Sequence, residues 1–291
     1  MEFARFQSEI AMKLFCHLWN QTKTFTQATP KIVLLHGMGG TGALWRPIAA
    51  SLEEKMAVLA PDQRGHGKSL LSPTPEIEDP LHFTPLSYGQ DVAETLRALH
   101  FHPTWILGHS MGVRTAVATA HLMPNEIQGL ILVDLGFAGS AGGGLGITLA
   151  HFLKILPEKF PSRKEAKDFM HSHCPDPSIA RYLLAVSTLH SDGQITFPFD
   201  HSALIQTIEE AEDFSLRDWL RDLGSKEIPI LTLRGKKSLV WSKEQFDGER
   251  ETFSKQKTFF FKEVDEAGHG LPFEQRNTFL SIIQEFMNHY I

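Results

Sequence analysis

Short, unbroken apolar runs alternate along this chain with segments of helical spacing, and this alternation restricts the fold more than any other feature. The run Lys31–Leu35 reads Lys-Ile-Val-Leu-Leu and is followed directly by His36-Gly37. Unbroken runs of this kind suit strands that are covered on both faces of a sheet. Alternating strands and helices predict an α/β fold with a doubly wound, mostly parallel sheet.

The same pattern gives the expected elements of this sheet. We expect strands at the apolar runs Lys31–Leu35, Ala57–Ala60, Trp105–Leu107, Leu130–Val133, Ile228–Leu233 and Thr258–Phe261. Helical spacing predicts helices at Ala43–Glu54, Tyr88–Leu99, Met111–Leu122 and Thr278–Tyr290. Two further strand-like runs, Glu2–Gln7 and Met12–Trp19, come before them.

The regular alternation stops between Leu135 and Ser225, in a stretch that looks mostly helical, with Pro and Gly breaks. An insertion between two sheet strands usually packs as a cap over the carboxyl ends of the strands. We therefore expect a core domain at residues 1–134 and 226–291 and a helical cap at 135–225. The expected cap helices are His151–Leu156, Arg163–Met170, Ile179–Ser187 and Ser202–Ala211. Because Gly142-Gly143-Gly144 leads into the cap, we expect the 138–148 segment to be mobile and cap movement to gate substrate entry.

Composition excludes several classes of protein. With 42% hydrophobic and 21% charged residues, the chain has ordinary globular composition rather than that of a disordered or fibrous protein. The charge of −6, from 28 Lys and Arg against 34 Asp and Glu, argues against a nucleic-acid partner. Cys16 and Cys174 are too few for a disulfide scaffold and fit a reducing compartment. Charges interrupt the first residues, and no apolar run spans a bilayer, so we expect no signal peptide, no membrane span and a cytoplasmic location.

The segment Gly108-His109-Ser110-Met111-Gly112 follows an apolar run and opens a predicted helix. This is the nucleophile-elbow pattern, in which a serine sits on a tight strand-to-helix turn and glycines on either side prevent clashes. The helix amino terminus supplies amide donors and a favourable dipole for developing negative charge. The alternative is a plain turn with a serine helix cap.

A glycine-rich segment, His36-Gly37-Met38-Gly39-Gly40, follows the Lys31–Leu35 strand. An acyl-transfer enzyme needs two amide donors aimed at the tetrahedral oxyanion. We expect these to be the backbone N–H groups of Met111 and Met38, because the glycines allow close approach of this backbone to a substrate. Taken alone, the segment is equally well a glycine-rich turn with no special role. The later segment Pro61–Ser69 is interpreted as structural, with charged groups that hold its loop.

These three motifs, in this order and spacing, resemble the α/β-hydrolase superfamily, and within it the chain is similar to bacterial acyl esterases with a helical cap. The resemblance is strong over Lys31–Leu135, good over Ile228–Tyr290 and loose over the cap. It implies the α/β-hydrolase fold and a Ser–acid–His machinery. The family places its histidine after the last strand, so Ala267-Gly268-His269-Gly270 makes His269 the expected base. By contrast, His171-Ser-His173-Cys174 lacks a common zinc spacing, and we expect no metal.

The acid departs from the commoner family pattern. Most relatives carry Asp just after the strand matching Ile228–Leu233, where this chain has Ser238 and Leu239. Asp134 offers a replacement, because it ends the preceding strand and some family members supply their acid from there. The order Ser110, Asp134, His269 is that of the family. Asp265 and Glu263, which are nearer His269 in sequence, remain alternatives.

We therefore expect a serine hydrolase that cleaves a carboxylic ester or related acyl compound through Ser110, Asp134 and His269, with a small-molecule acyl substrate and without a cofactor. A second hypothesis is carbon–carbon bond cleavage, lyase or acyltransferase chemistry on the same fold. It rests on Arg114, which some related lyases carry at this place to bind a carboxylated substrate. A third is a non-catalytic binding protein. Neither the substrate nor the oligomeric state follows from the sequence.

Overall fold

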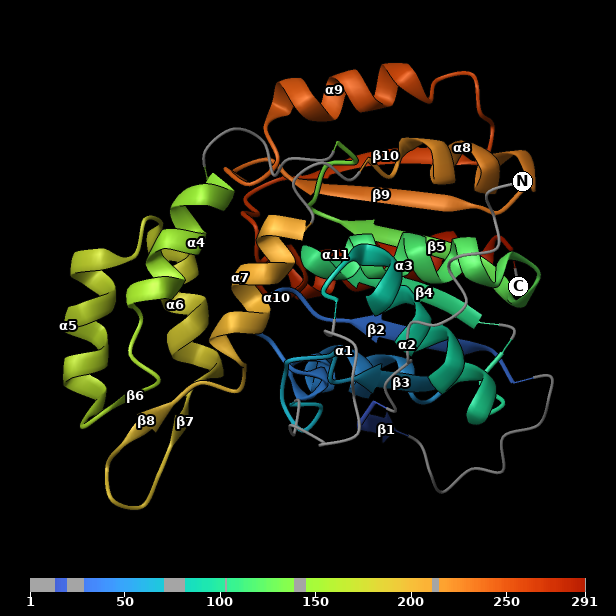
Figure 1. The fold of residues 1–291 in the computed structure, drawn as a ribbon. Coiled ribbons are helices and arrows are strands. Elements are labelled where there is room, and N and C mark those ends of the chain that lie inside the picture. Colours follow the sequence, from blue (N-terminus) through green and yellow to red (C-terminus); the bar gives the residue numbers. More distant parts are fainter. Residues whose placement is uncertain are drawn as a thin grey trace, which may run out of the picture.

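A computed structural model describes residues 14–19, 29–70, 82–102, 104–138, 145–210 and 215–290 of the chain. Its centre is a seven-stranded sheet in the order β1-β3-β2-β4-β5-β9-β10 (Figure 1). The strands are β1 (Cys16–Trp19), β2 (Lys31–Leu35), β3 (Ala57–Pro61), β4 (Thr104–His109), β5 (Ile127–Val133), β9 (Ile230–Gly235) and β10 (Phe259–Val264). β1 pairs antiparallel with β3 at one edge, and the other pairs are parallel. The doubly wound, mostly parallel sheet expected from the sequence is confirmed.

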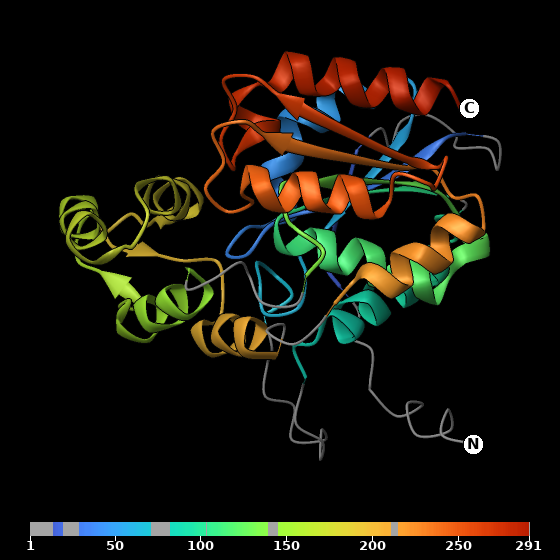
Figure 2. The same cartoon turned by 90° about the horizontal axis from the view of Figure 1, so that it is seen from above.

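Helices cover both faces of this sheet, as Figure 2 shows from above. Alternate residues of β2 divide between two apolar clusters: Val33 and Leu35 pack on one face, and Ile32 and Leu34 on the other. Such two-sided burial is the physical reason for unbroken apolar strands. One face is covered by α2 (Pro85–Ala98), α3 (Met111–Leu122), α8 (Arg217–Ser225) and α9 (Lys243–Thr252), and the other by α1 (Arg46–Leu52) and α11 (Arg276–Asn288). The remaining core elements are η1 (Gly42–Trp45), η2 (Pro124–Glu126) and α10 (Leu271–Glu274).

Most expected elements are found within a few residues of their predicted limits, and β2 and α3 match them fully. Of the run expected over Met12–Trp19, the described part begins at Leu14, and Cys16–Trp19 within it pairs with β3. The other expected strand, Glu2–Gln7, lies outside the described residues. The helix α9 is not among the expected elements, although Ser242 and Gln245 form a capping box that marks its start.

The insertion contains the helices α4 (Leu145–Ile155), α5 (Arg163–His173), α6 (Pro177–Val186) and α7 (His201–Glu210), which lie together beside the sheet (Figure 1). The mostly helical prediction missed a small three-stranded sheet in the order β6 (Lys159–Phe160), β8 (Ile195–Thr196), β7 (Thr188–Leu189). Strands of two residues are too short to produce a periodic pattern, which explains the omission. The cap has an apolar cluster of its own, which includes Phe152, Phe160, Met170, Leu183 and Phe199.

Polar contacts hold the carboxyl-terminal part of the cap to the core. Gly67 N donates to Pro198 O at 2.7 Å, and Asp200 N donates to Gly65 O at 2.9 Å. The buried hydroxyls of Tyr88 in α2 and Thr207 in α7 are 2.7 Å apart. These contacts anchor α7 and residues 198–200 before it to the core.

The limits of the cap remain a proposal. The expected range 135–225 includes α8, but Leu216, Leu220 and Leu223 belong to the same apolar cluster as the core strands. These contacts favour ending the cap after α7. The expected mobility of segment 138–148 falls largely outside the described residues. Among the helices within the described ranges, none is long and apolar enough to cross a membrane.

Candidate active site

Ser110 lies on the turn between β4 and α3, with φ 54° and ψ −124°. Residues other than glycine rarely adopt a positive φ, and such backbone strain concentrates at functional sites. The flanking glycines allow the turn to close: a Cβ on Gly108 would lie 2.1 Å from Gly112 O, and a Cβ on Gly112 would lie 2.5 Å from Leu35 O. A side chain at either position would clash with the backbone, so both positions require glycine, as the elbow pattern predicts.

His269 joins Ser110 to Asp134. Its Nε2 lies 3.0 Å from Ser110 Oγ, and its Nδ1 lies 2.8 Å from Asp134 Oδ2. With the proton on Nδ1, the ring donates to the carboxylate and accepts from the serine hydroxyl, which is the arrangement of a nucleophile, a base and an orienting acid. The ring of His109 lies beside that of His269, and its Nε2–H donates to His269 O at 2.7 Å. This bond fixes the loop that carries His269.

Asp134 follows the last residue of β5, is fully buried and has φ 57°. Besides the bond from His269, Oδ1 accepts from Gly235 N at 2.9 Å and Oδ2 accepts from Ser238 Oγ at 2.5 Å. A buried carboxylate needs such donors, because an unpaired charge there is costly. Ser238 lies in the loop where the family resemblance led us to expect the acid, and its hydroxyl donates to Asp134.

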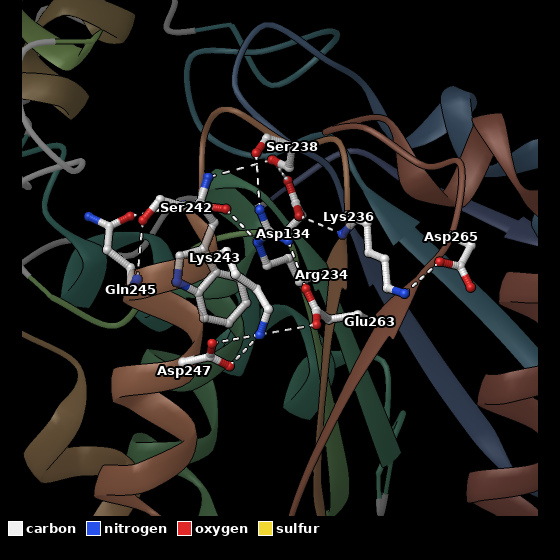
Figure 3. A network of polar contacts seen from close by, with 12 residues as sticks. Asp134, Arg234, Lys236, Ser238, Ser242, Lys243, Gln245, Asp247, Glu263 and Asp265 are labelled. Carbon is white, nitrogen blue, oxygen red and sulfur yellow. Dashed lines mark hydrogen bonds and ion pairs between the residues drawn. The ribbon is translucent and has the colours of Figure 1, made fainter.

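The alternative carboxylates are held elsewhere, as Figure 3 shows. Glu263 Oε1 accepts from Arg234 Nη1 at 2.8 Å, and Asp265 Oδ1 lies 2.6 Å from Lys236 Nζ. Arg234 also donates from Nε to Trp241 O at 2.7 Å, and so shapes the loop after β9. The structure brings Asp134, and neither Glu263 nor Asp265, to His269.

The loop at residues 36–40 is held by two buried histidines. His66 Nε2 accepts from Gly39 N at 3.0 Å, and His36 Nε2 accepts from Gln63 N at 3.0 Å. In each ring, Nδ1–H donates to a backbone carbonyl at 2.9 Å, Arg64 O for His66 and Gly37 O for His36. A ring nitrogen that accepts from an amide must be unprotonated.

Burial agrees with this neutral state. It lowers the pKa of His36 to about 4 and that of His66 to about 3, because desolvation disfavours the charged imidazole. His66 thus has a structural role, which agrees with the structural interpretation of the Pro61–Ser69 segment. In the same segment, Asp62 Oδ1 accepts from Gly42 N at 2.7 Å and Arg64 Nε donates to Asp91 Oδ2 at 2.6 Å.

These contacts hold the loop against the nucleophile. A Cβ on Gly37 would lie 3.0 Å from Ser110 Cβ, so the glycine permits this close approach. Met38 and Ser110 line one cavity, and Met111 is the first residue of α3. The predicted pair of oxyanion donors, the Met38 and Met111 amides, therefore comes from segments that meet beside Ser110.

The cavity in front of Ser110 and His269 has a volume of about 390 Å³. Its apolar walls come mostly from the cap and include Leu149, Leu153, Ile179, Leu183, Leu204 and, from the core, Phe273. Tyr182, Arg181 and Glu274 add polar groups to the lining. A cavity of this size and lining fits a small, largely apolar ligand.

Arg114, the basis of the second hypothesis, lies in α3 and is only 6% exposed. Its Nη2 donates to Ala138 O at 3.3 Å, and burial lowers its pKa to about 10. It lines a separate cavity with Arg217 and Trp241, not the cavity in front of Ser110. In the described part of the chain, no group of three or more His, Cys, Asp or Glu side chains is placed to hold a metal ion.

The chain is similar in sequence or in fold to several known proteins. A mouse (Mus musculus) protein named sn-1-specific diacylglycerol lipase ABHD11 is 26% identical over 265 residues, which cover 89% of this chain and 81% of the mouse protein. A solved structure titled marine microorganism esterase has a TM-score of 0.74 at 20% identity, covering 95% of this chain and 100% of the other. A crystal structure of E-2-(acetamidomethylene)succinate hydrolase has a TM-score of 0.72 at 21% identity, covering 89% and 91%. The model of the alpha/beta hydrolase family matches residues 32–281, and the chain therefore belongs to this family.

Proposed function

We propose that this protein is a serine hydrolase that cleaves a carboxylic ester or a related acyl compound through an acyl-enzyme intermediate. The observation that carries the proposal is the hydrogen-bonded chain from Ser110 Oγ through His269 to Asp134, with lengths of 3.0 and 2.8 Å, which opens on an apolar cavity. The names of the mouse lipase and of the marine esterase support an ester substrate. The apolar walls favour an acyl or alcohol group of low polarity.

In the first half of the reaction, Ser110 Oγ attacks the carbonyl carbon and its proton passes to His269 Nε2. Asp134 stabilises the resulting imidazolium through the Nδ1–H bond. The oxygen that gains negative charge accepts from the amides of Met38 and Met111. When the intermediate collapses, the ester bond breaks and His269 returns the proton to the leaving alcohol. Water then attacks the acyl-enzyme by the same route and frees Ser110.

The other hypotheses have less support. Arg114 lines a different cavity, so its position gives no support to carbon–carbon bond cleavage, lyase or acyltransferase chemistry on a carboxylated substrate. A non-catalytic binding protein would not need the strained Ser110 turn or the His269 bridge. We also propose a cytoplasmic location, on the composition and on Cys16 and Cys174, which are both free thiols.

A hydrolysis screen with p-nitrophenyl esters of graded chain length tests the proposal. We expect turnover by the unaltered protein and covalent labelling by a fluorophosphonate. Ser110→Ala should abolish the labelling and lower kcat by at least about a thousandfold while the protein stays folded. Labelling that persists in this variant, or a lack of turnover and labelling in the unaltered protein, would refute the proposal.

A further inference from the structure

The backbone around His269 forms a short loop that is held at both ends. Lys237 N donates to Ala267 O at 2.8 Å, and Phe273 N donates to Gly270 O at 2.8 Å. These bonds fix the points at which the loop leaves β10 and enters α10. The exact position of His269 between the two points depends on further contacts.

Two side chains bond to the backbone of the loop between these points. His109 Nε2–H donates to His269 O at 2.7 Å, and Glu274 Oε2 accepts from Gly268 N at 2.5 Å. Glu274 belongs to α10, which follows the loop directly, whereas His109 lies 160 residues from His269 in the chain. Of these two side-chain contacts, the one from His109 is therefore the contact that joins the loop to the central sheet.

His109 is the last residue of β4 and directly precedes Ser110. The register of the sheet pairs His109 with Val133 of β5, and Ser110 N donates to Val133 O at 3.0 Å. The sheet thus sets the backbone positions of both residues. The His109 side chain connects the backbone of the nucleophile to the backbone of the base, and it does so independently of the contact between Ser110 Oγ and His269 Nε2.

The surroundings of His109 determine the orientation and charge of its ring. The residue is 4% exposed, and its ring centroid lies 4.9 Å from that of His269 and 6.3 Å from that of Phe273, which it meets edge-on. A carbonyl oxygen only accepts, so the proton of His109 is on Nε2. Burial, together with the neighbouring His269, lowers the pKa of His109 to about 4. The ring is therefore neutral at neutral pH and does not oppose the positive charge that His269 gains from Ser110.

We propose that His109 is a positioning residue, which sets the distance between His269 Nε2 and Ser110 Oγ by holding the His269 carbonyl against β4. The proposal rests on the proposed serine hydrolase function. Proton transfer from Ser110 depends on this separation of 3.0 Å, and a misplacement of about 1 Å can lower a rate by about 10²-fold. Asp134 holds the ring of His269, whereas His109 holds its backbone, so the two contacts restrict different parts of one residue.

The test compares three substitutions that differ in the donor they supply. The amide nitrogen of glutamine is as many bonds from Cβ as Nε2 of histidine, so His109→Gln keeps a donor within reach of His269 O. His109→Asn ends one bond short, and His109→Phe keeps a ring without a donor. For a p-nitrophenyl ester, we expect kcat to fall by about 10- to 100-fold in the last two variants and by less than about fivefold in His109→Gln, with KM changed by less than about threefold. Fluorophosphonate labelling should slow in the same order and still reach completion, because Ser110 and His269 are intact.

A second comparison separates positioning of the base from a general effect on the fold. In the Asp134→Asn background the His269 ring has already lost its orienting carboxylate, so His109→Asn should lower kcat there by less than about threefold. His121→Phe is the matched control, because His121 stacks its ring on Trp219 with centroids 4.4 Å apart and does not line the cavity in front of Ser110. We expect its kcat to stay within about threefold of that of the unaltered protein. Circular dichroism checks that each variant is folded at the temperature of the assay.

Several results would overturn the inference. They are an unchanged kcat in His109→Asn and His109→Phe, equal losses in His109→Asn and His109→Gln, a rise in KM alone, or the full loss retained in the Asp134→Asn background. If His109→Phe does not fold, the comparison of His109→Asn with His109→Gln decides. An unaltered protein that neither hydrolyses esters nor labels would instead refute the proposed function itself, so the two failures are distinguishable.

Discussion

At the carboxyl edge of the sheet, Asp134 accepts hydrogen bonds from Gly235, Ser238 and His269, whereas the cap supplies mostly apolar walls to the cavity in front of Ser110. The buried acid of the core therefore has its hydrogen-bond partners before a substrate binds, and the cap surrounds a substrate mainly with apolar contacts.

The physical basis of this difference lies in the packing of each region. The core loops hold one another through pairs such as His66 with Gly39 and Arg234 with Trp241 O. The cap is held together by its own apolar cluster, and it contributes most of the apolar wall of the cavity. Apolar contacts are less directional than hydrogen bonds. We infer that the core determines the reaction, whereas the cap determines which substrate fits.

The strongest test of the organised core is Asp134→Asn. The amide cannot hold the imidazolium of His269 as the carboxylate does, so we expect kcat to fall by about 10⁴-fold. Steady-state kinetics on a p-nitrophenyl ester measure the loss. The matched control is Asp265→Asn, which changes a carboxylate that pairs with Lys236 at the surface and should keep kcat within about tenfold. A large loss in the control with little loss at Asp134 would show that the acid is assigned wrongly.

Acid pH should loosen the loop at residues 36–40 before it affects the cap's apolar cluster. The pKa values of His36 and His66 are lowered in the folded state to about 4 and 3, so the unfolded chain, with a histidine pKa near 6.5, binds more protons below that pH. The contribution of these two histidines to the free energy of unfolding is thus fully present above about pH 6.5. It is lost as the pH falls towards their pKa values in the folded protein. At pH 5 the loss should be about 2 kcal/mol for each histidine, or about 30-fold in the unfolding equilibrium constant.

Urea unfolding at pH 7.5, 6 and 5 measures this loss. His66→Asn, which loses the neutral ring, should reduce the pH dependence as well as the stability at pH 7.5. A free energy of unfolding that does not change between pH 7.5 and 5 would contradict the neutral, buried state of these rings.

The contribution of the cap to specificity is tested by Ile179→Ala. Ile179 lines the cavity, and its truncation should change the ratio of kcat/KM between short and long acyl chains by about tenfold, since a few methylene contacts are worth about 1–3 kcal/mol. Ile155→Ala is the matched control, because Ile155 is 55% exposed on α4 and does not line the cavity. If the ratio of kcat/KM changed equally in both variants, residues that line the cavity would affect specificity no more than exposed residues of the cap.

The smallest effect is expected for Ser238→Ala. The Ser238 hydroxyl donates to Asp134 Oδ2 at 2.5 Å, but Gly235 N and His269 still donate to this carboxylate in the variant. We expect kcat to fall by about three- to tenfold and the free energy of unfolding to fall by about 2 kcal/mol, the range for a hydrogen bond to a charged group. A loss above about a hundredfold would mean that Ser238 acts as part of the catalytic unit and does more than position the acid.

The sequence by itself determined the elements and the candidate site residues. The strand Lys31–Leu35 follows from its own apolar residues, and the turn at Ser110 follows from the glycines on either side of it. Both depend on residues that are close in sequence, so both can be predicted from it. Asp134 could be named as the acid because it follows a strand whose carboxyl end must lie in the active-site layer. The start of α9 also has a local signal in the sequence, the capping box of Ser242 and Gln245.

Only the tertiary structure decided which of these groups meet. The register that pairs Val133 with Leu233 places Asp134 beside Gly235 and the loop that carries Ser238, 104 residues away in the chain. His269 lies 135 residues from Asp134, and a choice between Asp134, Asp265 and Glu263 depends on that register and not on sequence distance. The bond from His109 to His269 O spans 160 residues and has no local signal, because it depends on how the loop after β10 lies against β4. Local patterns record how a segment folds with its neighbours, whereas contacts between distant segments depend on how the packed layers fit together.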